Sequence, residues 1–154
     1  MGYLQAKDIV SGQEGRAYAT FDGVVEEMFY VKSIEATAEK QKEEVKVLGK
    51  RGTQSKAAGW TGTGTMTIYY TTSRFRQLML RYIKDGIDTY FDIQIINDDS
   101  TTNIGRQASV LRNVNLDSVT VAKLDTESSL LDEEISFTFD DYDLQESFTD
   151  PVLG

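Results

Sequence analysis

Two patterns of hydrophobic and polar positions organise the chain: alternation over most of its length, and one helical stripe. The clearest alternation runs from Gly59 to Tyr70. Its two faces are Thr61, Thr63, Thr65, Thr67 and Tyr69 on one side, and Gly62, Gly64, Met66, Ile68 and Tyr70 on the other. Successive side chains of a strand point to opposite faces, so the segment is predicted to be a half-buried strand. Glycines inside a strand indicate a bulge or the close approach of another backbone. A phosphate-binding loop is excluded, because such loops lead directly into a helix N-terminus.

The same alternation predicts a mainly β chain. Further strands are expected at 16–21, from about 24 to 38, at 89–96, at 108–124 as one strand or two, and at 131–142. Asp22-Gly23 is typical of a tight hairpin turn. Shifts of the apolar phase at Lys32-Ser33 and at Asp117-Ser118 indicate β-bulges.

One segment has the spacing of an amphipathic helix. After a Thr72-Ser73 N-cap, a helix is predicted from Arg74 to about Asp85, and Gly86 is expected to end it. Its apolar stripe consists of Phe75, Leu78, Met79, Tyr82 and Ile83. We expect this stripe to cover one side of the core formed by the strands.

Residues 40–59 show no sustained apolar pattern. A short helix is one interpretation, but we predict a long loop between strands, and loops of this length inside a domain are usually functional or disordered. The fold class is therefore an antiparallel β-sandwich or small barrel with one flanking helix (about 74–85) and this loop. We expect a single domain over residues 1–154, with a peripheral N-terminal segment at 1–15 and an acidic tail at 143–154.

Charge is distributed unevenly in this chain of 154 residues with a net charge of −9. From 117 to 154 there are eleven acidic residues against one basic residue, whereas 40–59 holds six basic residues against two acidic ones. The acidic total argues against a conventional nucleic-acid-binding protein, which would have a basic face. The asymmetry favours steered contact between copies, with a simple solvated surface as the alternative.

Catalytic and metal-binding motifs are not found in the sequence. The chain has no histidine and no cysteine, which excludes a Ser-His-Asp triad, imidazole ligands and thiolate chemistry. Asp98-Asp99 and Asp140-Asp141 do not match a calcium loop. Glu26-Glu27 and Glu133-Glu134 are predicted to be solvent-facing charges at strand edges. We therefore expect no enzyme activity, no cofactor and no metal. No apolar run is long enough to span a membrane, and cytosolic synthesis is expected.

Four segments, taken in order, resemble a known family. They are Asp22-Gly23 with Val31 to Ala36; the Gly49-x-x-Gly52 loop leading to Gly62 to Tyr69; Thr72 to Phe75 with Lys84-Asp85-Gly86; and Ser136 to Asp143. Together they resemble the tail tube proteins of contractile-tailed phages and of phage-like particles of Gram-positive bacteria. The specificity lies in their order and spacing, and they extend over nearly the whole chain.

The resemblance implies a β-sandwich or barrel with one helix, assembled as hexameric rings stacked into a hollow tube. Strands of each copy would form a continuous barrel around a lumen through which DNA passes without specific binding. A long loop would reach the next ring. It also implies no catalysis or cofactor. The implied partners are further copies of the chain and the tail sheath, baseplate and tape-measure proteins. The implied location is the virion tail or a phage-like particle assembled in the host bacterial cytoplasm.

On this interpretation the loop and the threonine strand supply the contacts between copies. The candidate contact residues are Lys46, Lys50, Arg51, Lys56, Trp60, Thr63, Thr65 and Thr67. The basic loop is expected to dock on acidic surface of the adjacent ring, with Asp140 to Glu146 as the candidate. Two alternatives remain open: the inner tube of a genome-free injection or bacteriocin-like particle, and a stand-alone β-sandwich binding module.

Overall fold

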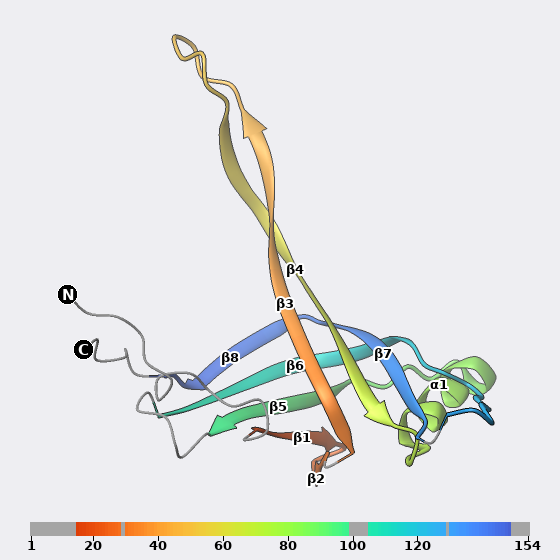
Figure 1. Cartoon of the computed structure of the whole chain (residues 1–154). Helices are drawn as coiled ribbons and strands as arrows, with labels where there is room; N and C mark the ends of the chain where they lie inside the picture. Colours follow the sequence, from red (N-terminus) through yellow and green to blue (C-terminus); the bar gives the residue numbers. More distant parts are fainter. Residues whose placement is uncertain (1–14, 29, 99–104, 129, 149–154) are drawn as a thin grey trace.

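The computed structural model describes residues 15–28, 30–98, 105–128 and 130–148. These residues form eight strands and one helix (Figure 1). The elements are β1 (Gly15–Phe21), β2 (Val24–Glu27), β3 (Val31–Val45), β4 (Gln54–Tyr69), α1 (Arg74–Asp85), β5 (Phe91–Asp98), β6 (Arg106–Ser118), β7 (Asp132–Phe139) and β8 (Asp141–Glu146). All pairings are antiparallel, and the strand order is β2-β1-β5-β6-β7-β4-β3, with β8 also on β6.

Strand β6 joins two parts of the sheet. Its first part pairs with β5 and β8, whereas Asn115 to Ser118 pair with β7. Asn113 between them has a φ of 54°, and this left-handed residue interrupts the regular strand. The sheet bends there, and the two parts bury one common core. Its most buried large side chains are Met66, Ile68, Phe75, Ile93, Val114, Ile135 and Phe137. The predicted antiparallel β class with one helix is confirmed, as an unclosed sheet.

The first hairpin follows from its turn residues. Asp22 and Gly23 both have positive φ, 50° and 81°, as a two-residue type I′ turn requires. The predicted strand over 24–38 is divided, because β2 ends at Glu27 and β3 begins at Val31. The bulge predicted at Lys32-Ser33 is confirmed by a register shift between Val31 and Ser33 opposite β4.

The helix has the predicted bounds, and its C-terminus is confirmed. Gly86 adopts φ 68° and its N–H donates to the carbonyl of Tyr82 at 3.0 Å. At the N-terminus the cap differs: Thr72 Oγ1 accepts from the Arg74 N–H at 3.2 Å, whereas Ser73 makes no side-chain cap bond. The expectation for the stripe is wrong in part, because only Phe75 is buried.

The prediction of a loop over 40–59 is wrong. Strand β3 continues to Val45 and β4 begins at Gln54, so the segment is mostly a two-stranded hairpin with its turn at 46–53. We call residues 40–59 the projecting hairpin and residues 46–53 its tip; the hairpin extends far from the rest of the chain, the body (Figure 1). Every residue of it is exposed. Because neither face is buried, the sequence had no reason to alternate apolar and polar residues there.

The remaining differences lie near the C-terminus. The strand predicted over 108–124 ends at Ser118, after a register shift near the expected bulge. The strand predicted over 131–142 is divided at Asp140 into β7 and β8. Part of the predicted acidic tail, Asp143 to Glu146, therefore belongs to the sheet. Residues 149–154 and the N-terminal segment up to residue 14 lie outside the described residues.

Candidate assembly surface

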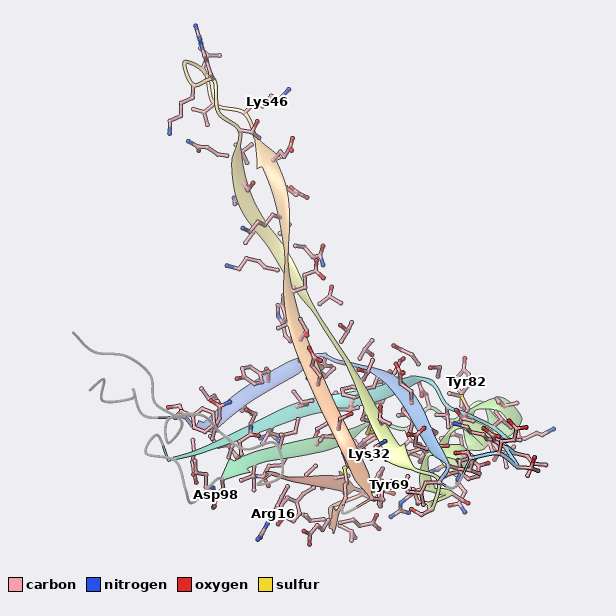
Figure 2. The ribbon with its side chains drawn as sticks, in the orientation of Figure 1. Arg16, Lys32, Lys46, Tyr69, Tyr82 and Asp98 are labelled. Atoms are coloured by element: carbon pink, nitrogen blue, oxygen red, sulfur yellow. The ribbon has the colours of Figure 1, made fainter. Side chains whose placement is uncertain are left out.

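The tip of the projecting hairpin is the most basic part of the described chain. Lys46, Lys50 and Arg51 lie in the turn, and Lys56 lies on the adjoining part of β4. Figure 2 shows Lys46 at the free end of the hairpin, far from the body. None of these four side chains forms an ion pair with another described residue. The tip thus presents positive charge that is not ion-paired among the described residues, at the end of a two-stranded arm.

The hairpin is bent where it leaves the body. The register between β3 and β4 shifts between Gln41 and Lys42, opposite Gly59, which has a φ of 139°. An L-residue rarely adopts that φ, so glycine is required for this irregularity. Trp60 follows directly; it is 45% exposed, with its ring centroid 5.9 Å from that of Phe139. Half of the indole is therefore available at the root of the hairpin.

Thr63, Thr65 and Thr67 belong to the part of β4 that is paired on both sides. Their partners are Thr37, Glu35 and Ser33 on β3, and Thr138, Ser136 and Glu134 on β7. Backbone pairing at these threonines is therefore satisfied within the chain. Any contact of theirs with a second copy is made by side chains.

These nine residues form what we call the polar face of the sheet. It consists of small hydroxyl side chains and two carboxylates, with no lysine or arginine among the nine. The opposite side of β4 carries Met66 and Ile68 into the core. Gly64 also lies on that side, where an added Cβ would be 2.8 Å from the carbonyl oxygen of Glu35 and closer still to the Phe137 ring. The glycines predicted to allow close approach do so.

The acidic segment 140–146 is largely engaged within the chain. Asp143 pairs with Arg112 at 2.8 Å, and Glu146 pairs with Arg106 at 3.0 Å. The carboxylate of Asp140 accepts from Asn113 at 3.0 Å. Hydrogen bonding with Asp143 and its charge raise the pKa of Arg112 above the usual arginine value. The segment therefore offers less free negative charge to a basic hairpin than its composition indicates.

A surface that the sequence did not reveal lies on α1 and the chain that follows it. Tyr82 is 53% exposed and Ile83 is 61% exposed, although both belong to the apolar stripe. Leu80, Ile87 and Tyr90 are exposed as well. The periodic stripe was visible in the sequence. An apolar stripe predicts that this side of the helix is covered, but it does not show whether the same chain or a second chain covers it.

Glu133 is buried, which corrects its assignment as a solvent-facing charge. It is 3% exposed and pairs with Arg76 of α1 at 2.5 Å. Arg76 also donates to the carbonyl of Thr72 and stacks over the Tyr70 ring at 4.3 Å. Burial raises the pKa of Glu133, while the charge of Arg76 opposes the shift. This pair links the helix to β7 through Oε2 of Glu133, while Oε1 is buried without a hydrogen-bond partner among the described residues.

The described residues contain no group of three or more Asp and Glu side chains positioned to hold a metal ion. The one helix among them is too short and too polar to cross a membrane. The described residues leave four features exposed: a basic tip, a half-exposed tryptophan, a polar face and an apolar helix face.

Comparison with known proteins agrees with this picture. A family described as phage tail tube protein matches residues 2–146. The phage-like element PBSX protein XkdM of Bacillus subtilis (strain 168) is 44% identical over 147 residues, covering 96% of this chain and 97% of that protein.

Two solved structures are similar in fold. One is the sheath-tube complex of the extracellular contractile injection system PVC in its extended state, with a TM-score of 0.70, 13% identity, and coverage of 92% of this chain and 95% of the other. The other is the SPP1 tail tube, with a TM-score of 0.64, 11% identity and coverage of 92% and 81%. The family match over nearly the whole chain and the 44% identical relative carry the assignment. This chain belongs to the phage tail tube protein family, a family of structural proteins.

Proposed function

We propose that copies of this chain assemble into hexameric rings that stack into the inner tube of a phage tail, the conduit for DNA during ejection. One observation carries the proposal. Residues 40–59 form a paired arm on which every residue is exposed. An isolated two-stranded hairpin is at best marginally stable in water. Packing against another molecule would bury part of the arm and so stabilise its folded conformation.

A second copy of the chain is the partner that fits best. The arm lies at one end of β4 and α1 follows the other end, so a contact between them would be head-to-tail. Head-to-tail contacts between unlike surfaces produce rings or open filaments. The proposed candidate contacts are those named from the sequence: Lys46, Lys50, Arg51, Lys56, Trp60, Thr63, Thr65 and Thr67. The number six and the presence of DNA rest on the family resemblance.

The free edge of β3 supports pairing within one ring. Among the described residues, β3 is bonded only on its β4 side. A long unpaired edge is a template for another strand, and closing a sheet into a barrel removes such edges. We assign the polar face to the lumen, because hydroxyl groups hold water and the carboxylates of Glu35 and Glu134 repel phosphate. DNA would then pass without specific binding, and no cofactor or catalysis is involved.

The test is the assembly state of the purified full chain. We expect sedimentation and negative-stain microscopy to give rings with six-fold symmetry and tubes of stacked rings. A compact monomer that stays monomeric at high concentration contradicts the proposal. Reversing the tip charges in the triple variant Lys50→Glu, Arg51→Glu, Lys56→Glu should block polymerisation while the circular dichroism spectrum of the monomer is retained.

A genome-free particle is the second candidate, favoured by the similarity to the PVC sheath-tube structure. The tube would have the same architecture, with sheath and baseplate proteins as partners in both cases and a tape-measure protein setting its length. Particles purified from the producing bacterium distinguish the two: encapsidated DNA and neighbouring capsid and terminase genes identify a phage tail. Tubes without DNA or those genes identify the alternative. In both cases assembly in the host bacterial cytoplasm is proposed.

A further inference from the structure

A pocket lies beside α1, between the helix and β6. Its apolar lining comes from Leu78, Met79 and Tyr82 of the helix and from Leu116 of β6. Two carboxylates, Asp88 and Asp117, lie on the same lining, and no lysine or arginine does. The pocket holds about 290 Å³, room for one aliphatic side chain. Thr89 and Asn115 complete the lining. A pocket that combines four apolar or aromatic side chains with two carboxylates and no cation is complementary to an apolar group flanked by positive charge.

The tip of the projecting hairpin has that composition. Leu48 stands at its end with 103% exposure, more than in an extended reference chain. Val47 beside it is exposed too. Lys46, Lys50 and Arg51 flank this apolar pair. A large aliphatic side chain at the end of an arm is unfavourable in water, and its burial in an apolar pocket stabilises the complex.

The two features lie at opposite ends of the molecule. β4 is 16 residues long, with the tip before its first residue and α1 shortly after its last. At about 3.3 Å per residue the strand spans roughly 50 Å. In Figure 2, Lys46 on the tip and Tyr82 on the helix lie at opposite ends of the molecule. The tip therefore cannot reach the pocket of its own chain, but it can reach that of a copy stacked in the same orientation.

Resting on the proposed tube assembly, we propose that Leu48 of one copy inserts into the pocket between α1 and β6 of a copy in the adjacent ring. Lys46, Lys50 and Arg51 then face Asp88 and Asp117. The contact is head-to-tail and leaves a free tip at one end of the stack and a free pocket at the other, so it propagates.

Other surfaces fit the tip less well. The pocket between β3, β5 and β8, lined by Ala36, Ile95, Leu111 and Tyr142 among others, has no charged residue in its lining. The pocket at β1 and β3 contains Arg16 and Lys32 with Glu27 as its one acidic residue, so its lining is less favourable to a basic tip. The acidic strand β8 has two of its carboxylates already paired with arginines.

Disulfide trapping tests the contact, because the chain has no cysteine of its own. The double variant Leu48→Cys, Met79→Cys is assembled and treated with a mild oxidant. A disulfide needs Cα atoms within about 7 Å, so a bond between these positions joins two chains, and repetition along a stack gives a ladder of covalent multimers. The control, Leu48→Cys with Leu144→Cys on β8, places the second thiol outside the pocket, at a leucine that is 48% exposed and therefore more accessible than the half-buried Met79.

The variant with cysteines at positions 48 and 79 is expected to give covalent trimers and larger multimers. The variant with cysteines at 48 and 144 is expected to give dimers at most. A second arm measures the concentration needed for assembly. Leu48→Ala should raise it about tenfold to a hundredfold, as loss of one buried leucine predicts, while Leu130→Ala should leave it unchanged.

Three outcomes separate the claims. A ladder specific to 48/79 supports the contact. Tubes that form normally but give no 48/79 ladder overturn the contact and leave the proposed tube assembly standing. Absence of rings and tubes from the unmodified chain overturns the proposed assembly, and the contact with it.

Discussion

The two halves of β4 differ although they form one continuous strand. From Gly62 to Tyr69 the strand is paired with β3 and β7, and it places Met66 and Ile68 in the core. From Gln54 to Thr61 it is paired with β3 alone, and every residue is exposed. The part from Gly62 to Tyr69 is stabilised by its own chain. The part from Gln54 to Thr61 is ordered by backbone pairing and, on the proposed assembly, by neighbouring copies.

The free-energy contrast between these halves is large. Full burial of an isoleucine or methionine side chain stabilises by about 1.5–3 kcal/mol, and the body contains many such side chains. The projecting hairpin buries none of its residues. Substitutions in the body should therefore change the stability of the monomer, whereas substitutions in the hairpin should change assembly and leave monomer stability almost unaltered.

The largest expected effect is at Phe137, which is fully buried between β4 and the rest of the core. Phe137→Ala should lower the free energy of unfolding of the unassembled protein by about 3–5 kcal/mol, since it removes a large ring and leaves a cavity. Urea denaturation followed by circular dichroism measures it. Leu48→Ala is the control from the hairpin, with an expected change below about 0.5 kcal/mol. Equal losses for the two variants would remove the contrast between the regions.

The ion pair beneath α1 comes next. Arg76→Ala leaves the carboxylate of Glu133 buried without its partner, which should cost about 3 kcal/mol or somewhat more. Arg81→Ala, on the exposed part of the same helix, is the matched control and should be nearly neutral. Chemical denaturation of both variants is the measurement. A neutral Arg76→Ala would mean that the pair does not hold the helix.

Glycines in the two regions give a third contrast. A Cβ at Gly64 would collide with Phe137 and with the carbonyl oxygen of Glu35, whereas one at Gly52 would meet nothing within 4 Å. Gly64→Ala should therefore lower the free energy of unfolding by about 1–3 kcal/mol. Gly52→Ala should change it by no more than about 0.5 kcal/mol. The two thermal unfolding curves decide the matter, and coincident curves would contradict the close packing of β4 on β7.

The smallest effect is a dependence on pH. Burial raises the pKa of Glu133 in the folded chain, so folding favours its protonated form. Its contribution to stability is present at low pH and is lost as pH rises through the raised pKa. Relative to Glu133→Gln, the wild-type free energy of unfolding should therefore fall as the pH rises above the ordinary glutamate pKa and through the raised pKa of Glu133. Glu134→Gln, at the exposed neighbouring position, should run parallel to wild type. If the wild-type free energy of unfolding instead rose with pH relative to Glu133→Gln, the assigned direction of the Glu133 pKa shift would be wrong.

The sequence predicted those parts of the fold whose burial lies within the chain. Phe75 and its spacing, with Gly86 beyond, predicted α1 from Arg74 to about Asp85, as observed, and Asp22-Gly23 predicted the first turn. The projecting hairpin was missed because neither of its faces is buried, so no alternation marks it. Exposure of Tyr82 and Ile83 was missed because a helical stripe looks the same whichever chain covers it. Burial of Glu133 depends on Arg76, which is 57 residues away in the sequence, and no local pattern reports such a pair.

Of the candidate contacts, those on the tip could be proposed from sequence, whereas those of the pocket could not. Lys46, Lys50 and Arg51 were proposed from the charge of their segment and from the family resemblance, and all three lie in the turn between β3 and β4. The receiving surface could not be found from sequence, because Met79, Asp88 and Leu116 come from three separate segments. Only the folded arrangement of α1 against β6 brings them to one pocket.

Hydrogen exchange at the backbone amides of β4 tests the central claim most directly. In the unassembled protein, amides from Gln54 to Thr61 should exchange rapidly, while those from Gly62 to Ile68 stay protected by pairing on both sides. In assembled tubes both halves should be protected. Equal protection of the two halves in the monomer, or rapid exchange from Gln54 to Thr61 within tubes, would contradict the claim that assembly stabilises the projecting hairpin.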